Sequence, residues 1–259
     1  MPSLNIFAIQ PDIVWENKAE NFSRIRTLLA VTPPTAGSLL ILPEMFSTGF
    51  SMDLSATKQS DAREDEAFLA ALAREYRSCV IGGVVGAGEN ERGRNQSVAF
   101  APDGSLLIRY TKIHPFSFGG EEVGHEHGAE VAIFEWGGFK IAPFVCYDLR
   151  FPEIFRAAAF KGAELFVVIA LWPVKRQQHW LTLLQARAIE NQAYVIGVNR
   201  VGAEPRYQYA GRSVVVDPHG ISIADAGERE CVLQSSINPE IVKAWRRDFP
   251  ALRDAHWRG

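Results

Sequence analysis

The chain has 259 residues, of which 47% are hydrophobic and 22% are charged, and its formal net charge is −3. This composition provides enough apolar residues for a sizeable core and argues against a disordered chain. The small negative charge gives no electrostatic reason to expect binding to nucleic acid or to an anionic membrane. We therefore expect one globular domain over residues 1–259.

Two further features predict a cytoplasmic location. The first residues lack the basic stretch and long apolar core of a signal peptide, and no apolar run reaches the ~20 residues of a membrane helix. The three cysteines, Cys79, Cys146 and Cys231, are odd in number and form no CxxC pair. That pattern is typical of reduced thiols.

Strand and helix patterns alternate along the chain. In the first half we expect strands at 4–9, 39–42, 79–85, 96–100 and 106–110, and helices at 16–29 and 62–76, the second capped by Asp61. In the second half we expect strands at 131–136, 139–145, 165–170, 194–199, 213–216, 221–224 and 232–237, and helices at 152–160, 176–191 and 239–246. Blocks of strand–helix units with inserted hairpins favour two stacked mixed sheets with helices outside.

A cysteine lies where an apolar strand meets a predicted helix, in Phe-Val-Cys-Tyr-Asp-Leu-Arg-Phe-Pro-Glu at 144–153. The positive N-terminal end of a helix favours thiolate over thiol, so Cys146 is a candidate nucleophile. Free cysteine is also a common packing residue, and its position alone does not establish a catalytic role. Cys79 and Cys231 have no flanking motif, and we interpret both as core or surface thiols.

Two charged residues follow other predicted strands. Glu44 ends the run Leu-Leu-Ile-Leu-Pro-Glu, and Lys112 lies in Arg-Tyr-Thr-Lys-Ile-His. Each alone could be a solvated charge at a strand end. Together with Cys146 they supply a proton acceptor, a cation and a nucleophile. Amide hydrolysis needs all three, because the carbonyl is a poor electrophile and its oxyanion must be stabilised.

These motifs, in the order Glu, Lys, Cys, resemble those of the nitrilase superfamily of carbon–nitrogen hydrolases along nearly the whole chain. The resemblance implies a four-layer α-β-β-α sandwich that pairs into an α-β-β-α-α-β-β-α homodimer. It implies a catalytic triad of Glu44, Lys112 and Cys146, with no metal and no cofactor. The backbone N–H of Tyr147 is then the natural second donor to the oxyanion.

The resemblance also implies a second glutamate between the lysine and the cysteine, where it orients the lysine. The segment 119–128 contains three candidates, Glu121, Glu122 and Glu126. The preceding glycine and the spacing to Gly128 favour Glu121, and the other two remain open. The neighbouring His125 and His127 are weak evidence for a metal site, because no third ligand with regular spacing follows.

The segment Leu-Trp-Pro-Val-Lys-Arg-Gln-Gln-His-Trp at 171–180, the run Leu-Gln-Ala-Arg-Ala-Ile-Glu-Asn-Gln at 184–192 and residues 44–50 resemble the omega-amidase subgroup. That resemblance implies hydrolysis of the terminal amide of 2-oxoglutaramate and 2-oxosuccinamate. We expect Arg176 to bind the far carboxylate, since a guanidinium can do so bidentately. Phe46, Phe118 and Trp172 are either walls of that pocket or ordinary core aromatics.

Three functions therefore remain open. The leading one is an omega-amidase. The second is another branch, such as an N-carbamoyl amino-acid amidohydrolase or an aliphatic amidase. The third is a catalytically silent fold used for binding. We also expect Asp148 and Arg150 to hold the turn around Cys146, and Arg187 to pair with Glu190 on a helix surface.

Overall fold

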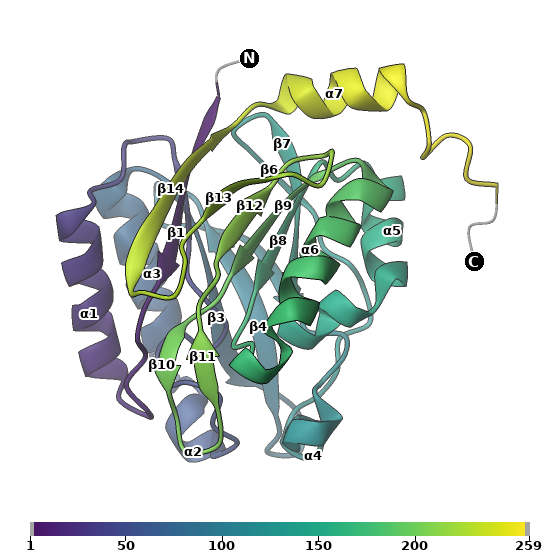
Figure 1. Ribbon diagram of the computed structural model, residues 1–259. Coiled ribbons are helices and arrows are strands. Elements are labelled where there is room, and N and C mark those ends of the chain that lie inside the picture. Colours follow the sequence, from purple (N-terminus) through teal and green to yellow (C-terminus); the bar gives the residue numbers. More distant parts are fainter. Residues whose placement is uncertain (1–2, 257–259) are drawn as a thin grey trace.

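The computed structural model describes residues 3–256, which form two stacked six-stranded sheets with helices on both outer faces (Figure 1). Helices α1 (Lys18–Val31) and α3 (Glu64–Tyr76) pack on the first sheet. Helices α5 (Pro152–Phe160) and α6 (Gln177–Asn191) pack on the second. The expected α-β-β-α sandwich is therefore confirmed.

The first sheet has the order β14-β1-β2-β3-β4-β5. Its strands are β1 (Leu4–Gln10), β2 (Leu39–Ile41), β3 (Cys79–Ala87), β4 (Gly93–Phe100), β5 (Leu106–Thr111) and β14 (Cys231–Ile237). The β1, β2 and β3 strands run parallel, whereas β4 is antiparallel to both β3 and β5. The C-terminal ends of β2 and β5 consequently lie at the same edge of this sheet.

The second sheet has the order β13-β12-β9-β8-β7-β6. Its strands are β6 (Phe134–Trp136), β7 (Phe139–Val145), β8 (Leu165–Ile169), β9 (Tyr194–Val198), β12 (Val214–Val216) and β13 (Ser222–Asp225). Three of them, β7, β8 and β9, are parallel neighbours. Loops that follow parallel strands meet at one edge, which is where α/β proteins commonly place their sites.

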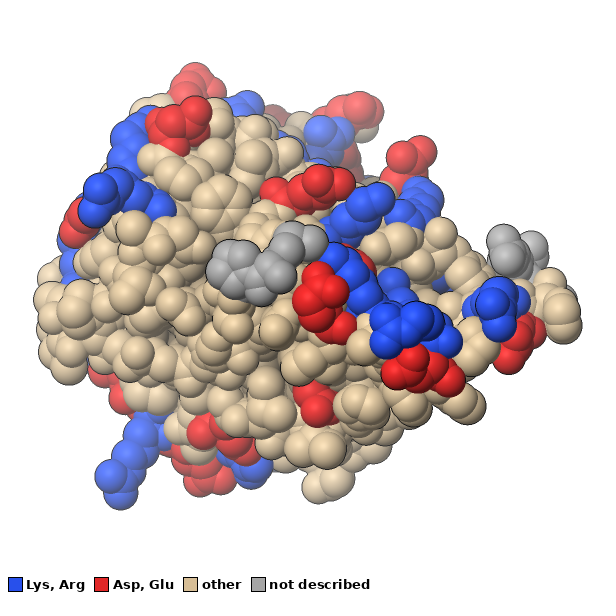
Figure 2. All heavy atoms as spheres, turned by 90° about the horizontal axis from the view of Figure 1, so that it is seen from above, with Lys and Arg blue, Asp and Glu red and all other residues tan. Residues whose placement is uncertain are grey.

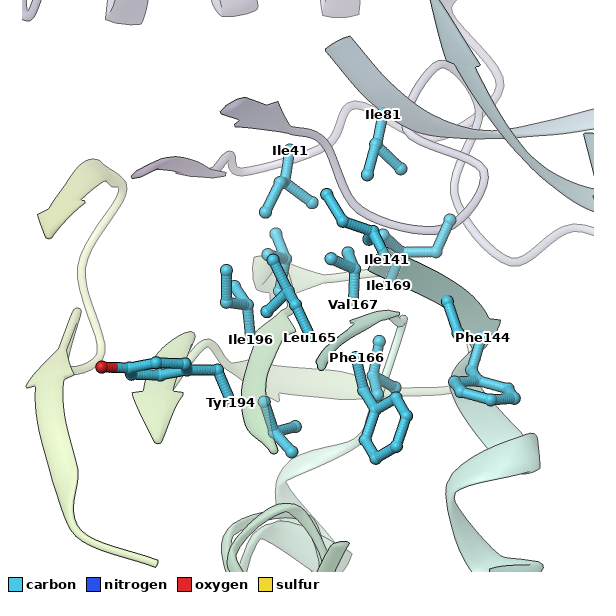
Figure 3. Packing of buried hydrophobic residues seen from close by; sticks show 14 of the residues in the cluster. Ile41, Ile81, Ile141, Phe144, Leu165, Phe166, Val167, Ile169, Tyr194 and Ile196 are labelled. Atoms are coloured by element: carbon cyan, nitrogen blue, oxygen red, sulfur yellow. The ribbon is translucent and has the colours of Figure 1, made fainter. Parts of the chain in front are cut away.

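The main core lies between the sheets (Figure 3). Ile41 and Ile81 of the first sheet face Ile141, Val167 and Ile169 of the second, and all five are fully buried. These strands are apolar on both faces because helices cover the other side. Burying one such side chain contributes roughly 1.5–3 kcal/mol, so the interface between the sheets fixes their relative position.

The order of the predicted strands and helices is confirmed, with ends shifted by a few residues. The largest shifts are in β6, which we expected at 131–136 and which begins at Phe134, and in β4, which we expected at 96–100 and which begins at Gly93. The expected cap of α3 was wrong: the helix begins at Glu64, and its N-cap residue is Arg63, whose side chain makes no capping bond. By contrast, Asn17 and Asn238 do cap α1 and α7 (Pro239–Asp248) through their side chains.

The sequence patterns missed several short elements. These are α2 (Leu54–Thr57), α4 (Glu121–Gly124) and the hairpin of β10 (Val201–Ala203) and β11 (Gln208–Ala210). In Figure 1 they gather at the lower end of the molecule, opposite α7. This is the end at which the parallel strands finish.

On the face seen in Figure 2, acidic and basic side chains lie next to one another, and broad areas carry neither. A mixed surface of this kind gives no long-range field of one sign. Within residues 3–256, no helix combines the length and the apolar character needed to cross a bilayer.

Candidate active site

A buried cluster of charges lies at the end of the first sheet. Lys112 follows β5 directly, and its Nζ donates to Oε1 of Glu44 at 3.0 Å and to Oε2 of Glu121 at 2.7 Å. All three residues have 0% exposure. The structure thus brings together the predicted base, the predicted cation and one candidate for the second glutamate.

The other two candidates for the second glutamate lie elsewhere. Glu122 is exposed, and Glu126 pairs with Arg94 at 2.6 Å. Glu121, in contrast, also accepts a 2.7 Å bond from the backbone N–H of Phe116. The geometry therefore favours Glu121 as the partner of Lys112.

The cluster holds Lys112 and Glu121 in their charged forms. Burial alone would lower the pKa of Lys112, but the carboxylates of Glu121 and Glu44 outweigh it and raise that pKa above its ordinary value. Burial would raise the pKa of Glu121, but Lys112 and the other hydrogen-bond donors hold it below its ordinary value. Buried charges persist only when they are paired and hydrogen-bonded in this way.

Cys146 follows β7 directly, in a short 3-10 turn over Cys146–Arg150 that leads into α5. Its φ of 48° lies in the left-handed region, which is strained for a residue with a side chain. Asp148 holds this turn: its Oδ2 accepts from the backbone N–H of Val145 at 3.1 Å and from the hydroxyl of Tyr110 at 2.8 Å. Asp148 is fully buried, so it stabilises the turn that carries Cys146 from within the protein interior.

The thiol of Cys146 is buried and protonated at rest. Burial raises its pKa well above the ordinary value, the nearby charge of Glu44 raises it further, and Lys112 opposes both. Burial of the thiol and the charge of Glu44 therefore oppose the effect that we expected from the helix end.

The main chain of Leu171, two residues past β8, contacts both sides of the site. Its N–H donates to Oε2 of Glu44 at 2.9 Å, and its carbonyl lies 3.9 Å from Sγ of Cys146. The cysteine and the glutamate therefore share a backbone neighbour, although they follow strands of different sheets.

A pocket with about 340 Å³ of empty space opens beside Cys146. Its lining is aromatic and aliphatic with two arginines, and consists of Phe50, Phe116, Cys146, Tyr147, Arg150, Leu171, Trp172, Pro173, Arg176 and Tyr207. A mostly apolar pocket with a few convergent polar groups is the usual form of a small-molecule site.

The two arginines are placed by aromatic side chains. The guanidinium of Arg176 lies 5.4 Å from the ring centre of Phe116, and that of Arg150 lies 4.8 Å from the ring centre of Trp172. Within residues 3–256 neither has a carboxylate at ion-pair distance. Burial and the charge of Arg176 lower the pKa of Arg150. The pocket therefore presents two cations that have no counterion in the described part of the chain.

Arg150 was placed wrongly by the sequence argument, which gave it only a role in the turn. It lines the pocket, four residues after Cys146 on the same turn. Its spacing of four residues from Cys146, on the same turn, was the sequence feature that could have placed it in the pocket. Arg187 was also misplaced: it does pair with Glu190 at 3.0 Å, but it is buried and donates to the carbonyl of Leu149 at 2.7 Å.

Two of the three predicted aromatic walls lie outside this pocket. Phe46 is fully buried and packs against Phe22 and Phe68, in the core beneath α1 and α3. Phe118 is 80% exposed and lines an outer groove next to the pocket. Trp172 is in the pocket, as expected. Sequence reasoning missed Phe50, Phe116 and Tyr207.

The loop histidines do not form a ligand cluster. His127 is exposed, while His125 is buried and burial lowers its pKa. In the described part of the chain, no three residues among His, Cys, Asp and Glu are grouped so that they could hold a metal ion.

Comparison with known proteins agrees with this geometry. A family model described as carbon–nitrogen hydrolase matches residues 6–247. An omega-amidase, YafV of Yersinia enterocolitica, is 36% identical over 98% of this chain and 97% of its own length. A 2-oxoglutaramate amidase of Bacillus subtilis is 31% identical over 96% of both chains.

A solved structure is similar over almost the full length. XC1258 of Xanthomonas campestris, a CN-hydrolase superfamily protein with an arsenic adduct in its active site, is 34% identical with a TM-score of 0.92. The match covers 99% of this chain and 98% of that one. Sequence, fold and the match over residues 6–247 agree, and the chain belongs to the carbon–nitrogen hydrolase family.

Proposed function

We propose that this protein hydrolyses the terminal amide of small 2-oxo dicarboxylic acid monoamides, such as 2-oxoglutaramate and 2-oxosuccinamate, and releases ammonia. The observation that carries this proposal is the pair of uncompensated arginines, Arg150 and Arg176, in one pocket with Cys146. A substrate with an amide at one end and a carboxylate at the other fits such a pocket. The named relatives at 31–36% identity support the same substrate class.

The first half of the reaction forms a thioester. Glu44 takes the proton of the Cys146 thiol, and the sulfur attacks the amide carbon to form a C–S bond. The oxyanion that develops is stabilised by Lys112 and by the backbone N–H of Tyr147. Glu44 then passes its proton to the nitrogen, the C–N bond breaks, and ammonia leaves.

The second half releases the acid. Glu44 removes a proton from a water molecule, whose oxygen attacks the thioester carbon. The C–S bond breaks, the sulfur recovers a proton from Glu44, and the 2-oxo diacid leaves. In this scheme Glu121 keeps Lys112 charged and directed at the site, since its Oε2 is 2.7 Å from Nζ.

The distal carboxylate is held by the two arginines. Each guanidinium can donate two parallel hydrogen bonds to a carboxylate, and charge-assisted bonds of this kind are about twice as strong as neutral ones. Phe116 and Trp172, which contact the guanidinium groups, keep these side chains at the pocket wall. This arrangement extends our sequence prediction, which assigned the carboxylate to Arg176 alone.

The alternatives fit the pocket less well. A simple aliphatic amide has no anion for the arginines. An N-carbamoyl amino acid does carry a carboxylate, and it remains the second candidate on that observation. A silent binding fold is disfavoured by the buried Glu44–Lys112–Glu121 cluster, because burying three charges carries a desolvation penalty that packing alone does not require.

We also propose that the protein is a cytoplasmic homodimer. The location is supported by the three cysteines, none of which forms a disulfide within residues 3–256. The dimer rests on the family resemblance. Size-exclusion chromatography with light scattering tests it, and a single species at about 29 kDa would overturn it, because the chain mass is 28.8 kDa.

The decisive experiment is ammonia release from a panel of amides. It compares 2-oxoglutaramate and 2-oxosuccinamate with N-carbamoyl amino acids and simple aliphatic amides, and uses Cys146→Ala as control. Fast turnover confined to the oxo-acid amides and abolished in the variant supports the proposal. Turnover only on the other amides would reject the substrate class and leave the nucleophile in place.

A further inference from the structure

A single amide group contacts both buried carboxylates. Asn95 lies in β4 with 1% exposure, and its Nδ2 donates to Oε1 of Glu44 and to Oε1 of Glu121, both at 2.7 Å. Its backbone carbonyl also accepts a 2.9 Å bond from the N–H of Lys112. Asn95 therefore touches three of the four residues of the buried site, and no part of the sequence analysis pointed to it.

The electrostatics of the cluster explain why such a group is needed. Two carboxylates share one ammonium, so the cluster carries an excess negative charge in a buried region. Like charges at short range favour protonation of one member. A side-chain amide has two N–H groups, and here each points at a different carboxylate. Two charge-assisted bonds thus offset the repulsion without adding a charge.

The orientation of this amide is set by the carboxylates. Oδ1 of Asn95 is buried and has no hydrogen-bond partner within residues 3–256. An unpartnered buried carbonyl is unfavourable by about 1–3 kcal/mol, so the two bonds made by Nδ2 must outweigh it.

We propose that Asn95 is a positioning residue that holds the carboxylates of Glu44 and Glu121 in place and directed at Lys112, so that Glu44 is ready to accept the proton of Cys146. This inference rests on the proposed function in giving Glu44 the role of base. The other titratable groups that face the two carboxylates are Lys112, Cys146, His125 and Glu204. All of these stay in place in the variants below.

The first test is the pH profile of turnover in Asn95→Ala and Asn95→Asp. In Asn95→Ala, kcat falls by ~10- to 100-fold and the acidic limb of kcat/KM moves up by about one pH unit, because each lost bond to a charged acceptor had favoured the ionised form. KM changes little, since Asn95 is not part of the pocket lining.

Asn95→Asp is the sharper variant. It keeps the shape of the side chain but replaces the donor by a third carboxylate. It can donate only when it is protonated, so its activity optimum moves to lower pH than that of the wild type. Ser97→Ala is the matched control, because Ser97 is buried two residues along the same strand and its hydroxyl makes no hydrogen bond within residues 3–256.

The second test does not need a substrate. The lowered pKa of Glu121 stabilises the fold above the ordinary carboxyl range, and this stabilisation is lost as pH falls through the lowered value. Asn95→Ala weakens it, so the difference in Tm from the wild type is constant near neutral pH and narrows only as the pH falls below 4.5, the ordinary value for this carboxyl group. For Ser97→Ala the difference in Tm is the same at every pH.

The outcomes separate the two proposals. A wild-type kcat and a wild-type pH profile in Asn95→Ala would overturn the positioning role. So would a loss of activity in Asn95→Ala if its pH profile and its pH-independent Tm deficit matched those of Ser97→Ala. If the wild type is inactive on every amide but the Tm difference still narrows at low pH, the proposed function fails while the electrostatic role of Asn95 stands.

Discussion

The backbone N–H of Leu171 donates a 2.9 Å hydrogen bond to Oε2 of Glu44, and this bond joins the ends of two strands from different sheets. Glu44 follows β2 in the first sheet, and Leu171 follows β8 in the second. Because the carbonyl of the same residue lies 3.9 Å from Sγ of Cys146, the stacking of the sheets itself aligns base and nucleophile. Side-chain substitution at position 171 leaves both backbone contacts available.

The first prediction concerns the reactivity of Cys146. Burial and the charge of Glu44 raise its pKa, so the resting protein holds a thiol at neutral pH. Alkylation by iodoacetamide is expected to be slow at pH 7 and to keep rising beyond pH 9. In Glu44→Gln the charge is removed, so the rate rises at lower pH while turnover is lost. Peptide mass spectrometry gives the rate at each pH, and a plateau below pH 8 in the wild type would contradict the prediction.

The second prediction concerns Lys112→Met. This change removes the cation from two buried carboxylates, and breaking a buried ion pair in this way lowers the free energy of unfolding by roughly 3–5 kcal/mol. Turnover falls by about 10²–10³, the usual effect of removing one oxyanion donor. The stability deficit narrows at lower pH, where the orphaned carboxylates take up protons.

Urea denaturation at pH 5 and pH 7.5 measures the deficit caused by Lys112→Met. Lys175→Met is the control, because Lys175 is exposed and makes no ion pair within residues 3–256. An equal deficit at both pH values would show that the loss comes from packing rather than from unpaired charge.

The third prediction concerns the two arginines. Arg176→Ala and Arg150→Ala each raise KM for 2-oxoglutaramate by ~10- to 100-fold, since a hydrogen bond to a charged group contributes about 1.5–3 kcal/mol. Neither variant changes kcat/KM for a neutral aliphatic amide that the wild type hydrolyses slowly. The two variants act on one carboxylate, so their effects are not additive. Equal losses on charged and neutral amides would contradict the carboxylate role.

Much of the fold was predictable because its strands carry strong periodic signals. The buried strands around Ile41 and Val167 are short apolar runs bounded by glycine, proline or charged residues. The same reasoning brought Glu44, Lys112 and Cys146 to strand ends, and parallel strands then place those ends at one edge. Local patterns therefore predicted the strands and their ends, and the resemblance to the nitrilase superfamily supplied the four-layer sandwich and the roles of the three site residues.

The parts that were missed depend on contacts distant in sequence. The β10–β11 hairpin has only three residues per strand. Arg200, which directly precedes it, is buried, and its Nη2 donates to Oδ1 of Asp12 at 3.1 Å, 188 positions earlier in the chain. Phe46 follows Glu44 by two residues, yet it faces the helices rather than the pocket. The raised pKa of Cys146 needs the three-dimensional burial of the thiol. None of these follows from local periodicity.

The fourth prediction uses an ion pair far from the site. Burial alone would raise the pKa of Glu64, but hydrogen bonds from Lys18 and Ser60 lower it to about 2, from 4.5. The lowered value means that Glu64 stabilises the fold above pH 4.5 and that this contribution is lost as pH falls towards 2.

The Glu64→Gln variant tests whether this carboxylate stabilises the fold at neutral pH and loses that contribution on acidification. The variant is less stable than the wild type at pH 7, by ~1 kcal/mol or less because the carboxylate is partly exposed. The two proteins converge between pH 4.5 and pH 2. Thermal unfolding across this range measures the effect, and a difference that grows on acidification would contradict it.

The last prediction concerns the backbone beneath Glu44. Gly83 lies in β3, and a Cβ at this position would approach Cα of Glu44 to 2.5 Å and the backbone nitrogen of Met45 to 2.8 Å. Because these atoms are main chain, the Gly83→Ala variant must shift the loop that carries the base. A displacement of about 1 Å in a catalytic group can reduce turnover by ~10²-fold, and overpacking lowers stability by roughly 1–3 kcal/mol.

Gly124→Ala is the control for Gly83→Ala, since a Cβ at position 124 meets nothing within 4 Å and that glycine needs no left-handed backbone. Steady-state kinetics with 2-oxoglutaramate and thermal unfolding are measured on both variants. Wild-type turnover in Gly83→Ala would mean that the loop can move without displacing Glu44. Gly83→Ala is expected to lose turnover with a nearly unchanged KM, while Gly124→Ala behaves like the wild type. That result would show that position 83 requires glycine because the main chain of β3 contacts the main chain of Glu44 directly.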